Sequence, residues 1–204
     1  MLTTGSRLDR LLDGGFKEGT FYEVVGPSGV GKTQLLFTLA VEAAESKDVF
    51  FVDAIGTFRP ERVRELATLR GKDWNRTLSN IKVYRPKDLS TYILALEYAV
   101  EKAEVMLVDM FSDPFYEATD LSIRYKLALL TRSIGIACLK NNLLAVVTNG
   151  VRYRGELVPL GFEYTDPYVH IRLFLSKDEK GNLYAVREDT GKRERLEIYE
   201  GGMK

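Results

Sequence analysis

The chain has 204 residues, of which 45% are hydrophobic and 28% are charged. This composition is typical of soluble globular proteins and excludes the disordered, collagen-like and membrane-embedded classes. Lys and Arg total 29, and Asp and Glu also total 29, so the formal net charge is zero and any polyanion must be held by a local site. The length predicts a single domain spanning residues 1–204, built around one central sheet.

Cysteine usage and the apolar segments bear on the compartment. Cys138 is the only cysteine in the sequence, so neither an intrachain disulfide framework nor a zinc site made of several thiolates can form. The first ten residues lack an apolar signal core, and the longest apolar runs fall far short of the ~20 residues that a spanning helix needs. We therefore expect a cytoplasmic protein that does not enter the membrane.

Strand-like and helix-like patterns alternate along the first three quarters of the chain. Short β-branched or aromatic runs predict strands, and apolar residues three or four positions apart predict helices. In chain order, the predicted elements are strand 20–25, helix 34–45, strand 49–53, helix 60–71, strand 81–84, a helix through residue 100 capped by Asp88 or Ser90, strand 105–109, helix 121–141 and strand 143–148. This order predicts an α/β fold with a mainly parallel central sheet flanked by helices.

The pattern changes after Asn149. Short β-like runs at 168–175, 183–187 and 196–199 are joined by polar, glycine-containing turn segments. Such runs are typical of hairpins. We expect antiparallel strands added to the C-terminal edge of the sheet.

A glycine-rich segment follows the first predicted strand and opens the first long helix. It matches the pattern Gly-x-x-x-x-Gly-Lys-Ser/Thr, in which backbone N–H groups surround phosphates and the helix N-terminus adds positive charge. Lys32 would neutralise the β- and γ-phosphates, and the Thr33 hydroxyl would bind Mg²⁺. The segment predicts a P-loop, or Walker A, nucleotide site made of Gly26, Pro27, Ser28, Gly29, Val30, Gly31, Lys32 and Thr33.

Asp109 ends the apolar strand 105–109. In a P-loop protein, an acid at this position orients Mg²⁺ and its water ligands. The two features together predict ATP and Mg²⁺ as ligands, with Asp109 acting on the metal through water.

These motifs resemble those of the RecA/RadA recombinase superfamily, and most closely the short archaeal RadA paralogues of the RadB type. The resemblance covers most of the chain, from 2–15 through the P-loop and 32–35 to 57–62, 107–109 and 146–149. It implies a RecA-like core, nucleotide contacts that extend to Gln34, a role in homologous recombination or DNA repair, and a recombinase or another RadA-family protein as partner. We expect no counterpart of the superfamily's upstream DNA-binding domain, because the matched segments begin at residue 2 with the core pattern.

Two positions depart from the superfamily pattern. The resemblance implies a glutamate two residues after the aspartate of the second strand, where it positions the attacking water, but Ile55 stands there. It also implies a glutamine after Thr148 and Asn149, where this chain has Gly150. Because isoleucine cannot accept a proton, and a positioned general base contributes about 10²–10⁴ in rate, we expect ATP binding with weak or absent hydrolysis.

Two alternatives to an accessory or regulatory subunit stay open. A displaced acid, such as Glu61, Asp113 or Glu117, could make the chain an active DNA-dependent ATPase. A small-molecule phosphotransfer enzyme is the other reading. That class needs a lid rich in Arg and Lys, and we find no such segment in the sequence.

The sequence signals for DNA contact conflict. Arg152, Tyr153 and Arg154 occupy the position of the second DNA loop, where guanidinium groups can pair with phosphates and the aromatic ring can stack on a base. The first-loop segment, 111–120, contains three acids and no basic residue, so it should repel a phosphate backbone. We expect DNA binding to be weak.

Three further residues have structural rather than catalytic interpretations. Cys138 is expected in the core of the long helix. His170 has no second histidine to share a metal. Glu23, inside the first strand, is expected to belong to a structural polar pair.

Overall fold

The computed structural model describes residues 1–116, 120–153, 155 and 157–204. Its helices are α1 (Leu8–Leu11), α2 (Lys32–Ala43), α3 (Pro60–Leu69), α4 (Trp74–Ser79), α5 (Leu89–Lys102), α6 (Asp113–Tyr116), α7 (Leu121–Asn141) and α8 (Phe162–Thr165). Its strands are β1 (Phe21–Val25), β2 (Val49–Asp53), β3 (Ile81–Tyr84), β4 (Val105–Asp109), β5 (Leu144–Asn149), β6 (Val151–Tyr153), β7 (Leu157–Pro159), β8 (Ile171–Lys177), β9 (Leu183–Arg187), β10 (Arg193–Leu196), β11 (Ile198–Tyr199) and β12 (Gly202–Met203).

Eight strands form the central sheet in the order β10-β9-β8-β1-β5-β4-β2-β3. The pairings from β8 through β1, β5, β4 and β2 to β3 are parallel, whereas β8–β9 and β9–β10 are antiparallel. The predicted α/β fold is therefore confirmed. One detail differs, because β8 runs parallel to β1 and the antiparallel pairing begins only at β9.

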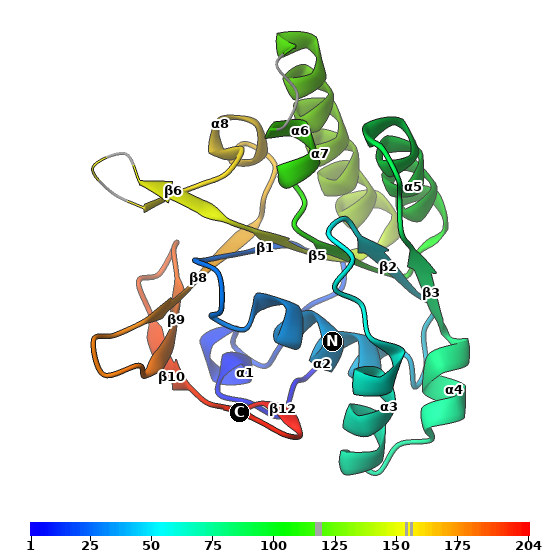
Figure 1. The fold of residues 1–204 in the computed structure, drawn as a ribbon, viewed down its shortest axis with the longest axis vertical. Coiled ribbons are helices and arrows are strands. Elements are labelled where there is room, and N and C mark those ends of the chain that lie inside the picture. The colour runs from blue at the N-terminus through cyan, green and yellow to red at the C-terminus, as the bar shows by residue number, and fades with distance from the viewer. Residues whose placement is uncertain (117–119, 154, 156) are drawn as a thin grey trace.

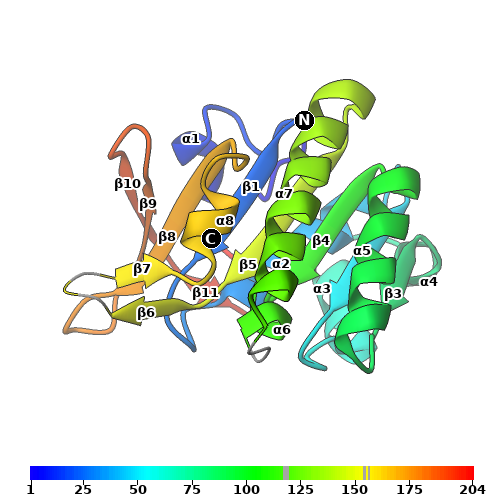
Figure 2. The ribbon, with the colours of Figure 1, turned by 90° about the horizontal axis from the view of Figure 1, so that it is seen from above.

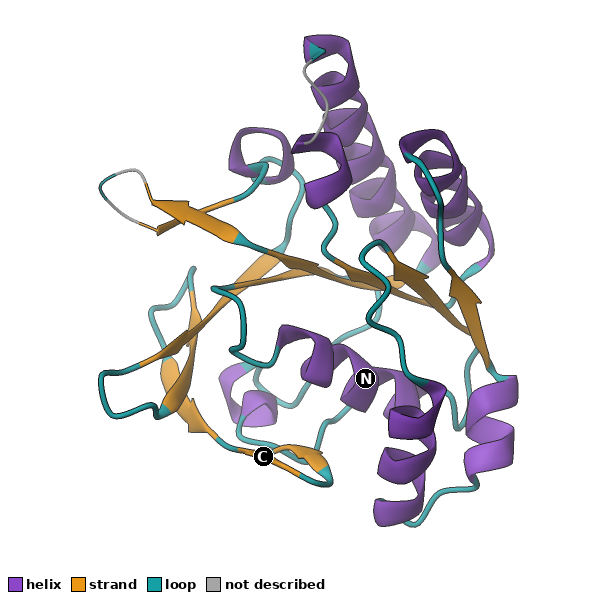
Figure 3. Ribbon diagram, in the orientation of Figure 1, coloured by secondary structure: helices purple, strands orange, loops and turns teal. Residues whose placement is uncertain are grey.

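Helices cover both faces of this sheet (Figures 1 and 3). Helices α1, α2 and α3 pack on one face, against side chains such as Phe51 and Leu107. Helices α5 and α7 pack on the other, against the alternate side chains Phe50 and Met106. Strands β1, β2, β4 and β5 are buried throughout, as parallel strands covered on both sides must be. Polar groups at the carboxyl ends of these strands therefore converge at one edge of a rigid core.

Local signals explain where several helices begin. Pro60 occupies the first turn of α3, where a missing N–H costs nothing. Asp88 and Thr91 form a capping box at the start of α5, and Asp120 accepts a hydrogen bond from the Ser122 N–H at the start of α7 (2.8 Å). In the part of the chain that the structure describes, no helix is long and apolar enough to cross a membrane.

Candidate nucleotide-binding site

The glycine-rich loop connects β1 to α2 and borders an open cleft of about 440 Å³. Gly29 and Gly31 adopt left-handed backbone conformations, with φ of 78° and 90°. Residues that have a Cβ atom rarely adopt these conformations. Gly31 is the N-cap of α2, so the amino end of this helix faces the cleft. The residues lining it are Ser28, Gly29, Gly31, Lys32, Thr33, Ile55, Thr57, Met110 and Ile198.

Lys32 lies across the loop in this structure. Its Nζ donates to the carbonyl oxygens of Gly26 (2.7 Å) and Pro27 (2.8 Å). Burial lowers the pKa of Lys32, and the negative charges of Asp109 and Asp113 partly oppose that shift. The ammonium group is thus held at the cleft by neutral acceptors, which a phosphate oxygen could replace with a stronger, charge-assisted partner.

Three threonine hydroxyls converge on the buried Asp109 carboxylate. Thr33 and Thr57 donate to Oδ2, each at 2.7 Å, and Thr148 donates to Oδ1 at 2.7 Å. These donors come from α2, the β2–α3 loop and β5, so one carboxylate ties three neighbouring elements together. Hydroxyl and carboxylate oxygens are the ligand type that Mg²⁺ prefers.

In nucleotide sites, Mg²⁺ is usually bound by one or two protein oxygens together with substrate phosphates and water. The Thr33 hydroxyl and the Asp109 carboxylate are oxygens of the kind that such a site uses. Thr33 would be the direct ligand and Asp109 the outer acceptor.

The chain turns sharply where β4 ends. Met110 has a left-handed conformation with φ of 63°, which is uncommon for a residue with a side chain. Its N–H donates to Thr148 Oγ1 (2.9 Å), and the N–H of Phe111 donates to the Thr148 carbonyl (2.8 Å). This turn places the Met110 side chain in the cleft wall.

The β2–α3 loop is fixed at its base by Asp53. This buried carboxylate accepts the N–H groups of Thr57 (2.9 Å) and Phe58 (3.0 Å) and pairs with Arg85 (3.1 Å). Ile55 lies in the same loop and is 49% exposed. It lines both the nucleotide cleft and a neighbouring cleft of about 380 Å³, so an apolar side chain occupies the boundary between them.

The structure separates the three acids considered as substitutes for the missing glutamate. Asp113 lines the neighbouring cleft with Ile55, and its charge acts on Lys32. Glu61 lines a different cleft, on the outside of α3. Glu117 lies outside the described residues.

The C-terminal hairpin, Glu197–Lys204, packs over the start of α2. Its strands β11 and β12 pair antiparallel, and Met203 is fully buried. Ile198 lines the nucleotide cleft, and a Cβ atom added to Gly31 would lie only 2.5 Å from Ile198 Cδ1. Nothing in the sequence pattern indicated that this hairpin would reach the phosphate loop.

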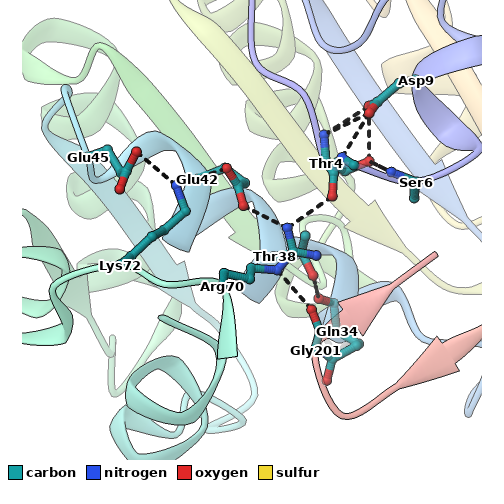
Figure 4. A network of polar contacts seen from close by, with 11 residues as sticks. Thr4, Ser6, Asp9, Gln34, Thr38, Glu42, Glu45, Arg70, Lys72 and Gly201 are labelled. Atoms are coloured by element: carbon teal, nitrogen blue, oxygen red, sulfur yellow. Dashed lines mark hydrogen bonds and ion pairs between the residues drawn. The ribbon is translucent and has the colours of Figure 1, made fainter. Parts of the chain in front are cut away.

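Arg70, just after α3, holds the hairpin in place (Figure 4). Its Nε donates to the Gly201 carbonyl (2.8 Å), while Nη1 donates to the Thr4 carbonyl (3.0 Å) and pairs with Glu42 (2.6 Å). Lys72 binds the other oxygen of Glu42 (3.1 Å). The N-terminal segment, α2, the end of α3 and the hairpin are therefore joined by one half-buried guanidinium group.

Other residues of the predicted P-loop site have supporting positions. Val30 is buried in the core below the loop. Gln34 lies in the first turn of α2, where its Oε1 accepts a hydrogen bond from Arg62 Nε (3.2 Å). Gly150 follows β5, and a Cβ atom there would lie 3.1 Å from Leu160 Cδ1 and 3.5 Å from Met110 Cε.

Two of the predicted DNA-contact residues, Arg152 and Tyr153, lie on β6 of the hairpin β6–β7, which projects from the sheet (Figure 1). Tyr153 is 76% exposed. Arg152 pairs with Glu163 (3.2 Å) and lies over the Tyr116 ring at 5.5 Å, so its guanidinium is already engaged. Arg154 lies outside the described residues.

Glu23 forms the structural polar pair that the sequence suggested. Arg172 Nε donates to its carboxylate at 2.6 Å, and Asn149 Nδ2 donates at 2.5 Å, so the contacts join β1, β8 and β5. Cys138 is buried, and burial raises the pKa of its thiol to about 12. His170 accepts a hydrogen bond from the Phe21 N–H at Nδ1 (3.1 Å).

Comparisons with known proteins identify the family to which this chain belongs. The Rad51 family model matches residues 1–153. The chain is 33% identical to the "DNA repair and recombination protein RadB" of Pyrococcus abyssi, over 74% of this chain and 67% of that protein. It is 32% identical to the RadB protein of Pyrococcus furiosus, over 82% of this chain and 76% of that protein. It is also 32% identical to the "DNA repair protein RAD51 homolog B" of Zea mays, over 86% of this chain but only 60% of that protein.

Proposed function

Because the chain belongs to the Rad51 family, we propose that it acts in DNA repair and homologous recombination as an ATP-binding accessory or regulatory subunit with weak or absent hydrolysis. One observation carries this proposal. The phosphate loop and the hydroxyl cluster on Asp109 are fully assembled, while the adjoining loop presents Ile55 to the same cleft.

ATP binding would use groups that the fold already positions. The backbone N–H groups of the glycine-rich loop and the amino end of α2 would receive the phosphates. Lys32 would exchange its two carbonyl acceptors for phosphate oxygens. Thr33 and Asp109 would hold Mg²⁺, which neutralises phosphate charge when bound. Ile198 and Met110 would form apolar walls of the cleft.

Hydrolysis requires a group that orients and deprotonates water, and Ile55 offers none. Gly150 does not compensate for this loss, because glycine has no side chain that could contact the γ-phosphate. These two positions support a chain that binds ATP and does not turn it over rapidly. We propose a recombinase or another RadA-family protein as partner, in the cytoplasm, with weak DNA binding through Tyr153 and Arg154.

A second candidate, a DNA-dependent ATPase with a displaced acid, is favoured by one observation. Asp113 lines the cleft that shares Ile55 with the nucleotide cleft, and its charge reaches Lys32. Phosphate release by the wild-type chain and by Asp113→Asn separates the two candidates. Rapid release that Asp113→Asn abolishes would favour the ATPase.

Nucleotide-dependent thermal stabilisation tests binding itself. ATP with Mg²⁺ at about 100 times Kd should add ~2.7 kcal/mol of stability. For a chain of this size that is about 5–10 °C in Tm. Lys32→Ala should remove most of this shift, whereas Lys140→Ala, on the opposite side of the sheet, should keep it. An equal ATP-dependent shift in Lys32→Ala would contradict the proposed site.

A further inference from the structure

Thr57 lies in the β2–α3 loop, and the proposed function gives it no role. Asp53 and Asp109 are register partners at the ends of the parallel strands β2 and β4, so the loop leaves the sheet beside Asp109. Helix α6, which follows β4, lies at the lower edge of the sheet in Figure 2, which is the edge where both strands end. The loop folds back over this edge, because the Thr57 hydroxyl reaches Asp109 at 2.7 Å.

Thr57 and Thr33 make equivalent contacts with Asp109. Each hydroxyl donates to the same oxygen, Oδ2, at 2.7 Å, so the two hydroxyl oxygens can be no farther apart than twice that distance. Both side chains line the nucleotide cleft. A hydroxyl has one proton to donate and two lone pairs that accept, so each oxygen keeps its acceptor capacity while it donates to Asp109. The β2–α3 loop thus supplies a second acceptor oxygen beside the proposed metal ligand Thr33.

The hydroxyl of Thr57 is not what anchors the loop. The backbone N–H groups of Thr57 and Phe58 donate to Asp53, and Arg85 donates both to Asp53 and to the Phe58 carbonyl, the latter at 3.0 Å. The Thr57 hydroxyl lies farther from Asp53 Oδ1, at 3.3 Å, than from Asp109. Its contact with Asp109 is therefore additional to a loop that is already fixed at its base.

We propose that Thr57 belongs to the metal site, an inference that rests on the proposed binding of ATP with Mg²⁺. Its hydroxyl oxygen would accept a hydrogen bond from a water bound to Mg²⁺, because Mg²⁺ keeps several waters in nucleotide sites. Partners of this outer kind contribute about 10–100-fold to metal affinity. Thr57 is thus a positioning residue for the metal. Through it, the β2–α3 loop that carries Ile55 responds to the bound metal without the missing glutamate.

The test measures how strongly Mg²⁺ tightens nucleotide binding. Calorimetric titration of a non-hydrolysable ATP analogue, in Mg²⁺ and in EDTA, gives a ratio of two affinities that does not depend on hydrolysis. Thr57→Val keeps the shape of the side chain and removes the hydroxyl, so it should lower this ratio about tenfold while the affinity in EDTA stays unchanged. Thr57→Ser should restore the wild-type ratio.

Thr148→Val is the matched control. The Thr148 hydroxyl also donates to Asp109, at 2.7 Å, but to Oδ1, and the residue is fully buried, so it cannot meet a metal-bound water. The ratio should therefore stay close to wild type in Thr148→Val. An equal fall in both valine variants would show that each acts only by orienting Asp109, and this would overturn the inference.

Hydrogen exchange provides a second readout that a purely structural role would not change. Amide exchange in residues 54–56 should slow when the analogue and Mg²⁺ bind to wild type or Thr57→Ser, but not when they bind to Thr57→Val. If Thr57→Val keeps the wild-type ratio or the wild-type protection, this inference alone fails and the proposed function stands. If the wild-type chain binds no analogue, the proposed function fails and this inference fails with it.

Discussion

Replacing Ile55 by glutamate tests whether hydrolysis is limited by one missing carboxylate. The side chain is 49% exposed in a loop whose base is fixed by Asp53, so the substitution should change stability by no more than about 0.5 kcal/mol. The new carboxylate would enter the cleft that Lys32 and Thr33 also line. A positioned general base contributes about 10²–10⁴ in rate, which corresponds to about 3–5 kcal/mol of the activation barrier.

We expect Ile55→Glu to raise the rate of phosphate release by a factor near the lower end of that range, about 10². The gain should be limited because Gly150 still supplies no amide to the γ-phosphate. The double variant with Gly150→Gln should exceed either single change, and by more than the sum of their separate effects. Gly150 has no left-handed backbone to forbid a side chain, although Leu160 must move by a few tenths of an ångström to admit one.

The assay is phosphate release at saturating ATP, with and without single-stranded DNA. Ile55→Gln is the matched control, since it has a similar size and polarity but cannot act as a base. Equal stimulation by Ile55→Gln would show that polarity, and not proton acceptance, was limiting. A wild-type chain that is as fast as Ile55→Glu would refute the reasoning altogether.

Three other perturbations have defined outcomes. Arg70→Ala should weaken ATP binding about tenfold, equivalent to ~1.4 kcal/mol, because it releases the C-terminal hairpin from the cleft. The control Arg64→Ala, within α3, should leave ATP affinity unchanged, and equal losses in the two variants by calorimetric titration would contradict this prediction. Burial lowers the pKa of His170, so the unfolded chain takes up the proton first as pH falls through about 6.5. The free energy of unfolding should therefore fall below that pH in urea titrations, and the decline should be smaller in His170→Asn. Tyr153→Ala should weaken binding of single-stranded DNA, and Arg154→Glu should reduce its salt dependence; an unchanged salt slope would place Arg154 off the DNA path.

The sequence predicts the elements of this fold well because local patterns determine them. The predicted helix 121–141 matches α7, and the strands at 49–53, 81–84 and 105–109 match β2, β3 and β4. Parallel pairing of β8 with β1 was missed because a short apolar run carries no sign of its direction. Direction depends on how the chain crosses the sheet through 150–170, where hydrophobic periodicity is weak.

The sequence predicts only the part of the candidate site that is contiguous. The other residues of the site are far from the motif in the sequence and meet it only in the folded chain. The Gly-rich loop is contiguous, so its motif can be read directly. Of the three hydroxyls that donate to Asp109, those of Thr57 and Thr148 lie 52 and 39 residues away from it, outside the Gly-rich motif. Ile198 reaches the cleft through a hairpin at the other end of the chain. The sequence predicted a DNA contact for Arg152, but it could not show the ion pair with Glu163, which lies on the short helix α8.

The positions of Asp109 and Ile55 in the fold explain how a chain could keep ATP binding and lose ATP hydrolysis. Asp109 is fully buried and joins α2, the β2–α3 loop and β5, so removing it would leave three threonine hydroxyls without their acceptor and destabilise the fold. Ile55 lies at the surface of a loop that is anchored without it. The fold therefore depends on Asp109, the acid that we propose acts on Mg²⁺, but it places no demand on the residue at position 55, where an acid would activate water. Retention of Asp109 alone consequently says little about catalysis, and Lys32→Ala and Ile55→Glu are the changes that report on nucleotide chemistry.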